Sequence, residues 1–183
     1  PFSAFVFIVI NILGFIGTTY FINTICFFLS PIALLVILGY SYTKRFTFLC
    51  HFILGLGLSL APIGAYLAVT GEFALLPVIY SFVVLFWVSG FDIIYALQDL
   101  DFDKEEELKS LPVFFGHKGA LQASVLLHVL SSVLVILAGY LAHFGLMYWL
   151  GCVFFIGLLI YQHTLVKPND LSKVNVAFFT TNG

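Results

Sequence analysis

Three aspartates with helical spacing are the residues of this chain whose types and positions point most directly to chemistry. Asp92, Asp99 and Asp103 are separated by seven and then by four residues. An α-helix turns by about 100° per residue, so this spacing puts the three carboxylates on one face, within about 40° of each other. Tyr95 falls on the same stripe, whereas Asp101 points away from it. Carboxylates clustered in this way suit a hard cation such as Mg²⁺, which in proteins often carries a phosphate-bearing ligand.

Asp92 differs from the other two because it lies within, or at the end of, a long apolar run. An ionised carboxylate inside a membrane is costly unless it is paired, bound to a metal or facing a wet cavity. The alternative interpretation is that residues 99–107 form only a solvated, acid-rich loop. That alternative explains neither Asp92 nor the four-residue step from Asp99 to Asp103, so we interpret the stripe as a candidate functional site.

Basic residues that could neutralise a phosphate occur in two connections between apolar runs. Lys44 and Arg45 lie in the earlier connection, and Lys104 and Lys109 follow the acidic stripe. Ammonium and guanidinium groups form charge-assisted hydrogen bonds with phosphate oxygens. The residues alone therefore predict a cation together with a phosphate-bearing ligand.

Histidines and cysteines give weaker signals. His51, His128 and His163 lie in or near apolar runs, where paired histidines can hold haem. No two of them share a helix at ligand spacing, so we do not expect haem, and we interpret His128 as a hydrogen-bonded interior or cavity residue. None of the cysteines belongs to a CxxC pair, and we interpret all three as buried, inert thiols: Cys26, Cys50 and Cys152.

The composition excludes a soluble globular domain. Hydrophobic residues make up 62% of the 183 positions and charged residues 9%, where a soluble domain has about 45–50% and about 25%. Such a chain has too little polar surface to cover it in water, so we expect an integral membrane protein in contact with lipid. The net charge of −2 gives no basic footprint, so nucleic acid is not an expected partner.

Apolar runs long enough to cross a membrane predict an all-α fold, a polytopic bundle of transmembrane helices. A spanning helix needs about 20 residues, and only helices and closed barrels satisfy every backbone group in lipid. No second, soluble domain is apparent, so residues 1–183 are interpreted as one membrane-embedded domain. A seventh run begins at about residue 174. The six complete runs lie at about 2–20, 23–40, 48–70, 73–97, 119–142 and 145–166.

The ends of the sequence suggest that it is part of a longer chain. It opens on Pro1 inside an apolar run, and its single methionine is Met147. The run from about residue 174 stops at Gly183, short of a spanning length. We therefore expect the domain to be truncated at both ends.

The distribution of charge predicts the orientation in the membrane. All seven basic residues lie in the second, fourth and sixth connections between the apolar runs, and the odd connections contain none. Alternate connections share one side of the membrane, and the positive-inside rule makes the basic side cytoplasmic. We expect an inner (cytoplasmic) membrane protein with its aspartate-rich connection on the cytoplasmic side.

Two motifs resemble those of the UbiA intramembrane prenyltransferases. The run from Asp92 to Asp103, followed by Lys109-Ser110-Leu111-Pro112 and Phe115-Gly116, resembles the second aspartate-rich motif of the family. Upstream, Tyr40-Ser41-Tyr42-Thr43-Lys44-Arg45-Phe46-Thr47 is similar to the tyrosine and lysine-arginine loop of the branch that prenylates 4-hydroxybenzoate. The resemblance implies a helical bundle around a central cavity. It also implies Mg²⁺-dependent transfer of a polyprenyl group from a polyprenyl diphosphate to an aromatic acid in quinone synthesis.

The resemblance also implies a role for each matching residue. Asp99 and Asp103 would bind Mg²⁺, Asp92 and Tyr95 would be catalytic residues near the diphosphate and the acceptor, and the diphosphate contacts would be Lys44 and Arg45. The first aspartate box of the family is absent from residues 1–183, and we expect it to precede Pro1. A naphthoate-type acceptor is the second choice for the substrate. A catalytically silent relative, acting as a structural or accessory membrane subunit, is the alternative function.

Overall fold

The computed structural model describes residues 2–182, and within this range the chain forms helices and no β-strand. Pro1 and Gly183, the two ends of the expected domain, lie outside the described residues. The helices are α1 (Phe2–Ile22), α2 (Thr24–Thr43), α3 (Cys50–Thr70), α4 (Leu75–Ala96), the 3₁₀ turn η1 (Leu97–Asp99), α5 (Leu100–Glu105), α6 (Leu111–Leu141), α7 (Leu146–Leu165) and α8 (Val174–Asn182).

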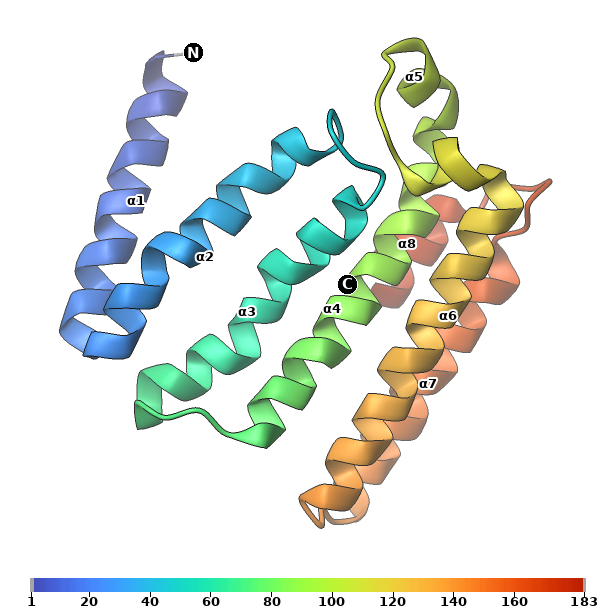
Figure 1. Cartoon of the computed structure of the whole chain (residues 1–183). Coiled ribbons are helices and arrows are strands. Elements are labelled where there is room, and N and C mark those ends of the chain that lie inside the picture. Colours follow the sequence, from blue (N-terminus) through green and yellow to red (C-terminus); the bar gives the residue numbers. More distant parts are fainter. Residues whose placement is uncertain (1, 183) are drawn as a thin grey trace.

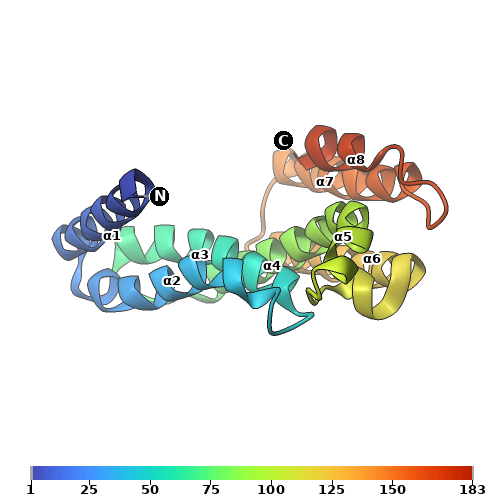
Figure 2. The same cartoon turned by 90° about the horizontal axis from the view of Figure 1, so that it is seen from above.

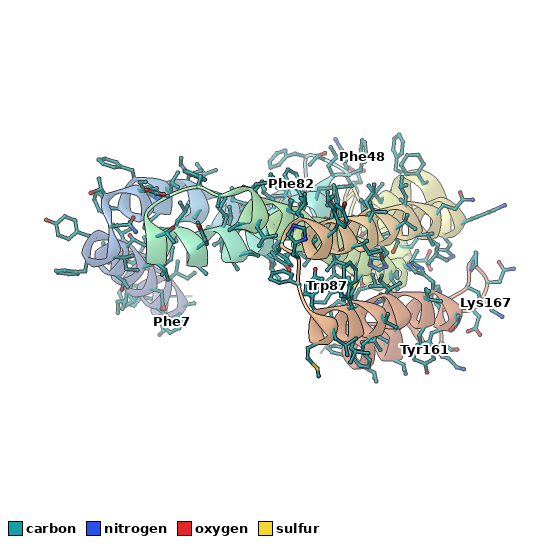
Figure 3. The ribbon with its side chains drawn as sticks, turned by 90° about the horizontal axis from the view of Figure 1, so that it is seen from below. Phe7, Phe48, Phe82, Trp87, Tyr161 and Lys167 are labelled. Atoms are coloured by element: carbon teal, nitrogen blue, oxygen red, sulfur yellow. The ribbon has the colours of Figure 1, made fainter. Side chains whose placement is uncertain are left out.

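Six helical segments in the described range are long and apolar enough to cross a membrane, which confirms the predicted number of spans. Most of their bounds agree to within a few residues, but the fourth segment ends at Glu105 instead of about 97 and the fifth begins at Leu111 instead of about 119. Their outward-facing side chains are apolar: Phe7 is 68% exposed and Leu35 is 74% exposed. Figure 3, seen from below, shows side chains projecting outward along the helices. This surface suits hydrocarbon and not water. The protein is a multi-pass integral membrane protein.

The helices form an open arc, as Figure 2 shows. Helices α1 to α4 and α6 follow one another in a curved row, and α7 with α8 forms a second layer at one end. Helix α4 is the centre of the packing, because its most extensive contacts are with α3 on one side and α6 on the other. Ile93 and Ile94 near its end are completely buried. The same part of α4 carries Asp92 and Tyr95, so the candidate site is built on the most constrained helix.

Serine hydroxyls hold α4 against its neighbours. They donate to backbone carbonyls across helix interfaces, which satisfies both groups where water is absent. The three bonds run from Ser89 Oγ to His51 O (3.2 Å), from Ser124 Oγ to Gly90 O (2.6 Å) and from Ser131 Oγ to Val83 O (3.0 Å). The first joins α4 to α3 and the other two join α6 to α4, so the positions of these helices along one another are fixed.

The segment after α4 differs from the prediction. One unbroken α-helix was expected to carry all three aspartates, but α4 ends at Ala96 and the 3₁₀ turn η1 precedes α5. The predicted connection over residues 100–118 is itself largely helical. It contains α5, and α6 begins at Leu111, where the Ser110 hydroxyl accepts a hydrogen bond from the backbone N–H of Val113. Gly116 breaks the first turns of α6 with φ 68° and ψ 177°, a conformation that favours glycine.

Candidate functional site

Lys44 lies between two of the predicted aspartates. Its Nζ is 2.7 Å from Asp103 Oδ1 and 3.9 Å from Asp99 Oδ2. Lys44 is the residue that caps α2, and its carbonyl accepts a hydrogen bond of 2.7 Å from the backbone N–H of Lys109. This bond fixes the α2–α3 connection against the segment that follows α5. Two motifs that lie far apart in the sequence therefore meet at one point.

The Asp103 carboxylate has unused capacity to bind a cation. Its side chain is 0% exposed, compared with 46% for Asp99 and 29% for Lys44. Apart from the ion pair with Lys44, neither oxygen of Asp103 has a hydrogen-bond partner among residues 2–182. An ionised carboxylate offers about four lone-pair positions. A buried one with a single cationic partner is a favourable place for further positive charge.

Asp92 is held by a histidine from the neighbouring helix. His51 Nδ1 lies 2.7 Å from Asp92 Oδ2, and it is the ring nitrogen that donates to the ionised carboxylate. The His51 side chain is 3% exposed and that of Asp92 is 23% exposed. Within the described chain the second oxygen of Asp92, Oδ1, makes no hydrogen bond. His51 thus fixes the carboxylate while one oxygen stays available for a ligand.

Lys44, Asp99 and the His51–Asp92 pair line one cavity of about 220 Å³. It opens between α2, α3 and α4, and it contains both motifs identified in the sequence. The residues that line it are Tyr40, Ser41, Lys44, Cys50, His51, Leu54, Asp92, Tyr95, Ala96 and Asp99. Four of the six predicted site residues are in this group, and Asp103 is connected to it through Lys44. Arg45 is exposed and does not line the cavity.

Aromatic rings from α8 cover Tyr95. The centroids of the Tyr95 and Phe178 rings are 4.4 Å apart, and those of Tyr95 and Phe179 are 6.3 Å apart. The α8 segment therefore supplies an aromatic wall beside the cavity. Asp101, which was expected to point away from the aspartate stripe, is exposed.

His51 is the residue of this site that sequence reasoning missed. It was considered only as a haem ligand, and the contact with Asp92 spans 41 positions of the chain. A usable signal was present: His51 and Asp92 are ionisable residues in neighbouring apolar runs, and such residues usually pair with one another. Applying that rule to both residues together would have suggested the pair.

The donor set fits Mg²⁺ when a phosphate shares the ion. Among residues 2–182 no group of three histidines, cysteines, aspartates or glutamates is arranged to hold a metal. Mg²⁺ in enzymes is commonly held by one or two carboxylates, with water and substrate phosphates completing the octahedron. Asp99 and Asp103 meet this requirement, and the Lys44 ammonium already lies beside both carboxylates as a positive charge.

The sequence is similar to one known protein family and to curated members of it. The sequence model of the UbiA prenyltransferase family matches residues 1–183. A 4-hydroxybenzoate octaprenyltransferase of Aliivibrio fischeri (strain MJ11) is 32% identical over 165 residues, which are 87% of this chain and 55% of the relative. One from Shewanella sp. (strain W3-18-1) is 31% identical over 176 residues, 96% of this chain and 61% of the relative. The chain thus spans a little over half the length of these curated relatives.

A solved structure shares the fold. The apo structure of a UbiA homolog from Aeropyrum pernix K1 superposes with a TM-score of 0.88 and 26% sequence identity. The match covers 98% of this chain and 68% of the other. The predicted helical fold is therefore confirmed by an independent structure.

Proposed function

Because the chain belongs to the UbiA prenyltransferase family, we propose that it transfers a polyprenyl group from a polyprenyl diphosphate to an aromatic acceptor of the 4-hydroxybenzoate type. The reaction would supply a prenylated ring for the synthesis of a membrane quinone. The observation that carries this proposal is the approach of Asp99 and Asp103 to Lys44 beside a cavity that Asp92 also lines. Relatives named 4-hydroxybenzoate octaprenyltransferase support the acceptor class.

Asp99 and Asp103 would hold Mg²⁺ with the diphosphate, and the ion would stabilise the negative charge that develops on the leaving group. Lys44 would donate hydrogen bonds to the same diphosphate once a divalent ion has taken its place between the carboxylates. Lys44 and Asp99 line the cavity and Asp103 pairs with Lys44, so the diphosphate is expected beside these three residues.

Asp92 and Tyr95 would act on the acceptor ring and on the allylic group that is transferred to it. The bond between the allylic carbon and the diphosphate oxygen breaks, a carbon–carbon bond forms to the acceptor ring, and the ring loses a proton. Asp92 Oδ1 is free to accept that proton, because His51 occupies only Oδ2. The Tyr95 ring beside Phe178 offers a π-face to the developing allylic cation. Apolar helices around the site exclude water that would capture this cation.

Transfer of a labelled polyprenyl diphosphate to 4-hydroxybenzoate tests the proposal. Membranes containing the full-length protein should form the product only with Mg²⁺ present. Asp99→Asn should lower the rate by at least about a hundredfold, since removing a group that stabilises transition-state charge costs about 3 kcal/mol. Asp101→Asn is the matched control, because this residue has the same chemistry two positions away but is exposed.

Two results would contradict the proposal. Equal losses in Asp99→Asn and Asp101→Asn would mean that the acidic segment acts only through its total charge. Folded protein that prenylates neither benzoate nor naphthoate acceptors would instead support a structural or accessory role in the membrane.

A further inference from the structure

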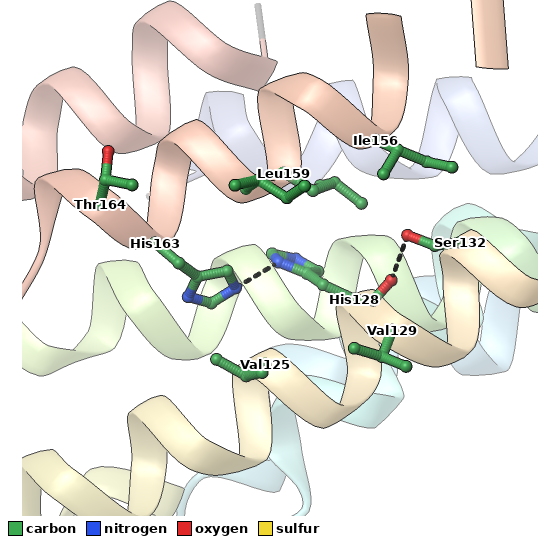
Figure 4. Close-up of a pocket in the computed structure, with 9 residues that line it drawn as sticks. Val125, His128, Val129, Ser132, Ile156, Leu159, His163 and Thr164 are labelled. Carbon is green, nitrogen blue, oxygen red and sulfur yellow. Dashed lines mark hydrogen bonds between the residues drawn. The ribbon is translucent and has the colours of Figure 1, made fainter. Parts of the chain in front are cut away.

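A second buried polar cluster lies away from the candidate active site, between α6 and α7. His128 Nδ1 and His163 Nε2 are 2.8 Å apart, and the other nitrogen of His128, Nε2, is 3.2 Å from the carbonyl oxygen of Trp87 on α4. His128 is only 3% exposed. Figure 4 shows the two rings in contact, with the remaining nitrogen of His163 facing away from His128.

The direction of every hydrogen bond in this chain of groups follows from one carbonyl. The oxygen of Trp87 can only accept, so His128 Nε2 carries a hydrogen and donates to it. A neutral imidazole has one N–H, so His128 Nδ1 accepts and His163 Nε2 donates. His163 Nδ1 is consequently left with a lone pair. In the described part of the chain no carboxylate pairs with either ring, and an unpaired charge in these spans would be costly, so both rings are neutral.

His163, which carries this free lone pair, lines an otherwise apolar cavity. Within residues 2–182 Nδ1 of His163 has no hydrogen-bond partner, because the contacts of this ring are those with His128. The cavity has a volume of about 310 Å³. Its lining residues are Val125, His128, Val129, Ser132, Ile156, Leu159, Ile160, His163 and Thr164. Both hydroxyls in this lining already donate to backbone carbonyls, Ser132 to His128 O and Thr164 to Tyr161 O.

We infer that this cavity is a binding site for the hydroxyl group of a membrane-soluble phenol or hydroquinone. The lining offers the ligand one strong acceptor, His163 Nδ1, and no N–H donor for a carbonyl group. An oxidised quinone, an ester or an ether presents only acceptors, so it would leave both itself and the histidine unpaired. An aromatic alcohol presents the missing donor, and its ring matches the aliphatic walls. The site lies within membrane-spanning helices, which a lipid-soluble ligand reaches from the bilayer.

This site is distinct from the candidate active site. The two cavities share no lining residue, and His128 and His163 lie on α6 and α7, whereas the other cavity opens between α2, α3 and α4. The inference therefore does not depend on the proposed prenyl transfer. It would hold for a silent relative as well as for an enzyme.

Binding of two matched probes to the full-length protein in lipid nanodiscs tests the inference. The probes are 4-octylphenol and 4-octylanisole, which differ only in the hydroxyl hydrogen that the methyl group replaces. We expect the dissociation constant of the phenol to be about tenfold lower than that of the anisole, the value of one hydrogen bond to a buried acceptor. His163→Leu should abolish this preference, and His163→Gln should keep much of it, because the amide oxygen can accept.

Two further variants show which of the two cavities the phenol occupies. Asp92→Asn should leave the preference for the phenol unchanged. Val129→Trp should weaken both probes by filling the cavity from a position that is 51% exposed and so tolerates a large residue. Equal binding of phenol and anisole by the unaltered protein would overturn the inference. So would a preference that survives His163→Leu but is lost in Asp92→Asn, since the phenol would then occupy the other cavity.

Discussion

Among single residues, Lys44 most clearly connects the resting structure with the proposed chemistry. Its ammonium lies 2.7 Å from Asp103 and 3.9 Å from Asp99. A divalent ion held by the same two carboxylates would have to share them with this ammonium. In the proposed reaction the lysine would neutralise the carboxylates before a metal binds and would compete with the metal for them. Once displaced, it would bind the diphosphate that accompanies the ion.

Replacing Lys44 by glutamine should separate these two roles. Without the competing ammonium, the affinity for Mn²⁺ in the absence of substrate should rise about fivefold, the equivalent of about 1 kcal/mol for a partly exposed ion pair. The KM for the polyprenyl diphosphate should rise at the same time. Electron paramagnetic resonance of bound Mn²⁺ measures the first effect. Arg45→Gln is the control, since Arg45 is exposed and outside the cavity; weaker Mn²⁺ binding in Lys44→Gln would disprove the competition.

His51 is expected to act through Asp92 and not on the substrate. His51→Leu removes the donor to Asp92 Oδ2. The rate should fall about thirtyfold, the equivalent of about 2 kcal/mol for an unpaired buried acceptor. His51→Gln should recover most of that loss, because its amide can donate to the same oxygen. The steady-state rate of prenyl transfer is measured for both variants. If His51→Leu is fully active, or if His51→Gln is as impaired as His51→Leu, this hydrogen bond does not position Asp92.

The residues of the site were predictable to the extent that their chemistry follows from local sequence. Asp99 and Asp103 were found from helical spacing, and Lys44 entered the interpretation as a nearby phosphate ligand. The ion pair of Lys44 with the aspartates could not be read from the sequence, since it depends on how the α2–α3 connection docks beside α5. His51 needed the same kind of information, because helix packing alone brings it to Asp92.

At the scale of secondary structure, the contact between α3 and α4 decides whether His51 reaches Asp92. Gly55 on α3 makes this contact close. A Cβ atom added there would lie 2.6 Å from the carbonyl oxygen of Leu85 and would also collide with Ser89 Oγ. The backbone of α4 cannot move away without disturbing its contacts with α6. A small residue at this position is therefore a requirement of the packing.

Gly55→Ala should destabilise the protein by about 1–3 kcal/mol, the usual effect of adding a methyl group to a filled interface. It should also slow prenyl transfer, because α3, which carries His51, and α4, which carries Asp92, would move apart. Gly64→Ala is the matched control on the same helix, where a new Cβ would meet no atom within 4 Å. Thermal unfolding in detergent compares the two variants, and identical melting temperatures would show that the α3–α4 contact tolerates a methyl group.

Helix positions followed from the apolar runs, but the segment between α4 and α6 did not. Hydrophobicity locates a helix that must face lipid, and this requirement fixed the six spans. The segment over residues 97–118 is rich in charged residues, so hydrophobicity does not locate its helices, which depend on capping and on contacts with neighbouring elements. The 3₁₀ turn at Leu97–Asp99 and the break at Gly116 are both of this kind. The 3₁₀ turn lies between Asp92 and Asp103, so the geometry of the candidate site, with Asp99 and Asp103 both near Lys44, depends on it.

At the scale of the whole molecule, the connections divide between the two ends of the helices. Figure 1 shows the α2–α3 connection, the α5 region and the α7–α8 connection at one end, with the other connections at the opposite end. The first group contains the basic residues and the candidate diphosphate site. Charge and fold thus agree on one polarity: the end that carries the candidate diphosphate site is the end that the positive-inside rule assigns to the cytoplasm.

Cysteine labelling tests this orientation in cells. In a background with Cys26, Cys50 and Cys152 replaced by serine, single cysteines can be introduced at the exposed positions Glu72, Glu106 and Ser172. A membrane-impermeant maleimide should label Glu72→Cys from outside the cytoplasmic membrane, because the α3–α4 connection is expected on that side. It should label Glu106→Cys and Ser172→Cys only in inverted vesicles. Labelling of Glu72→Cys and Glu106→Cys from the same side would contradict the spans themselves. A complete reversal would keep the spans but put the diphosphate site on the side where a charged, cytoplasmically made substrate could not reach it, and would thereby count against the proposed reaction.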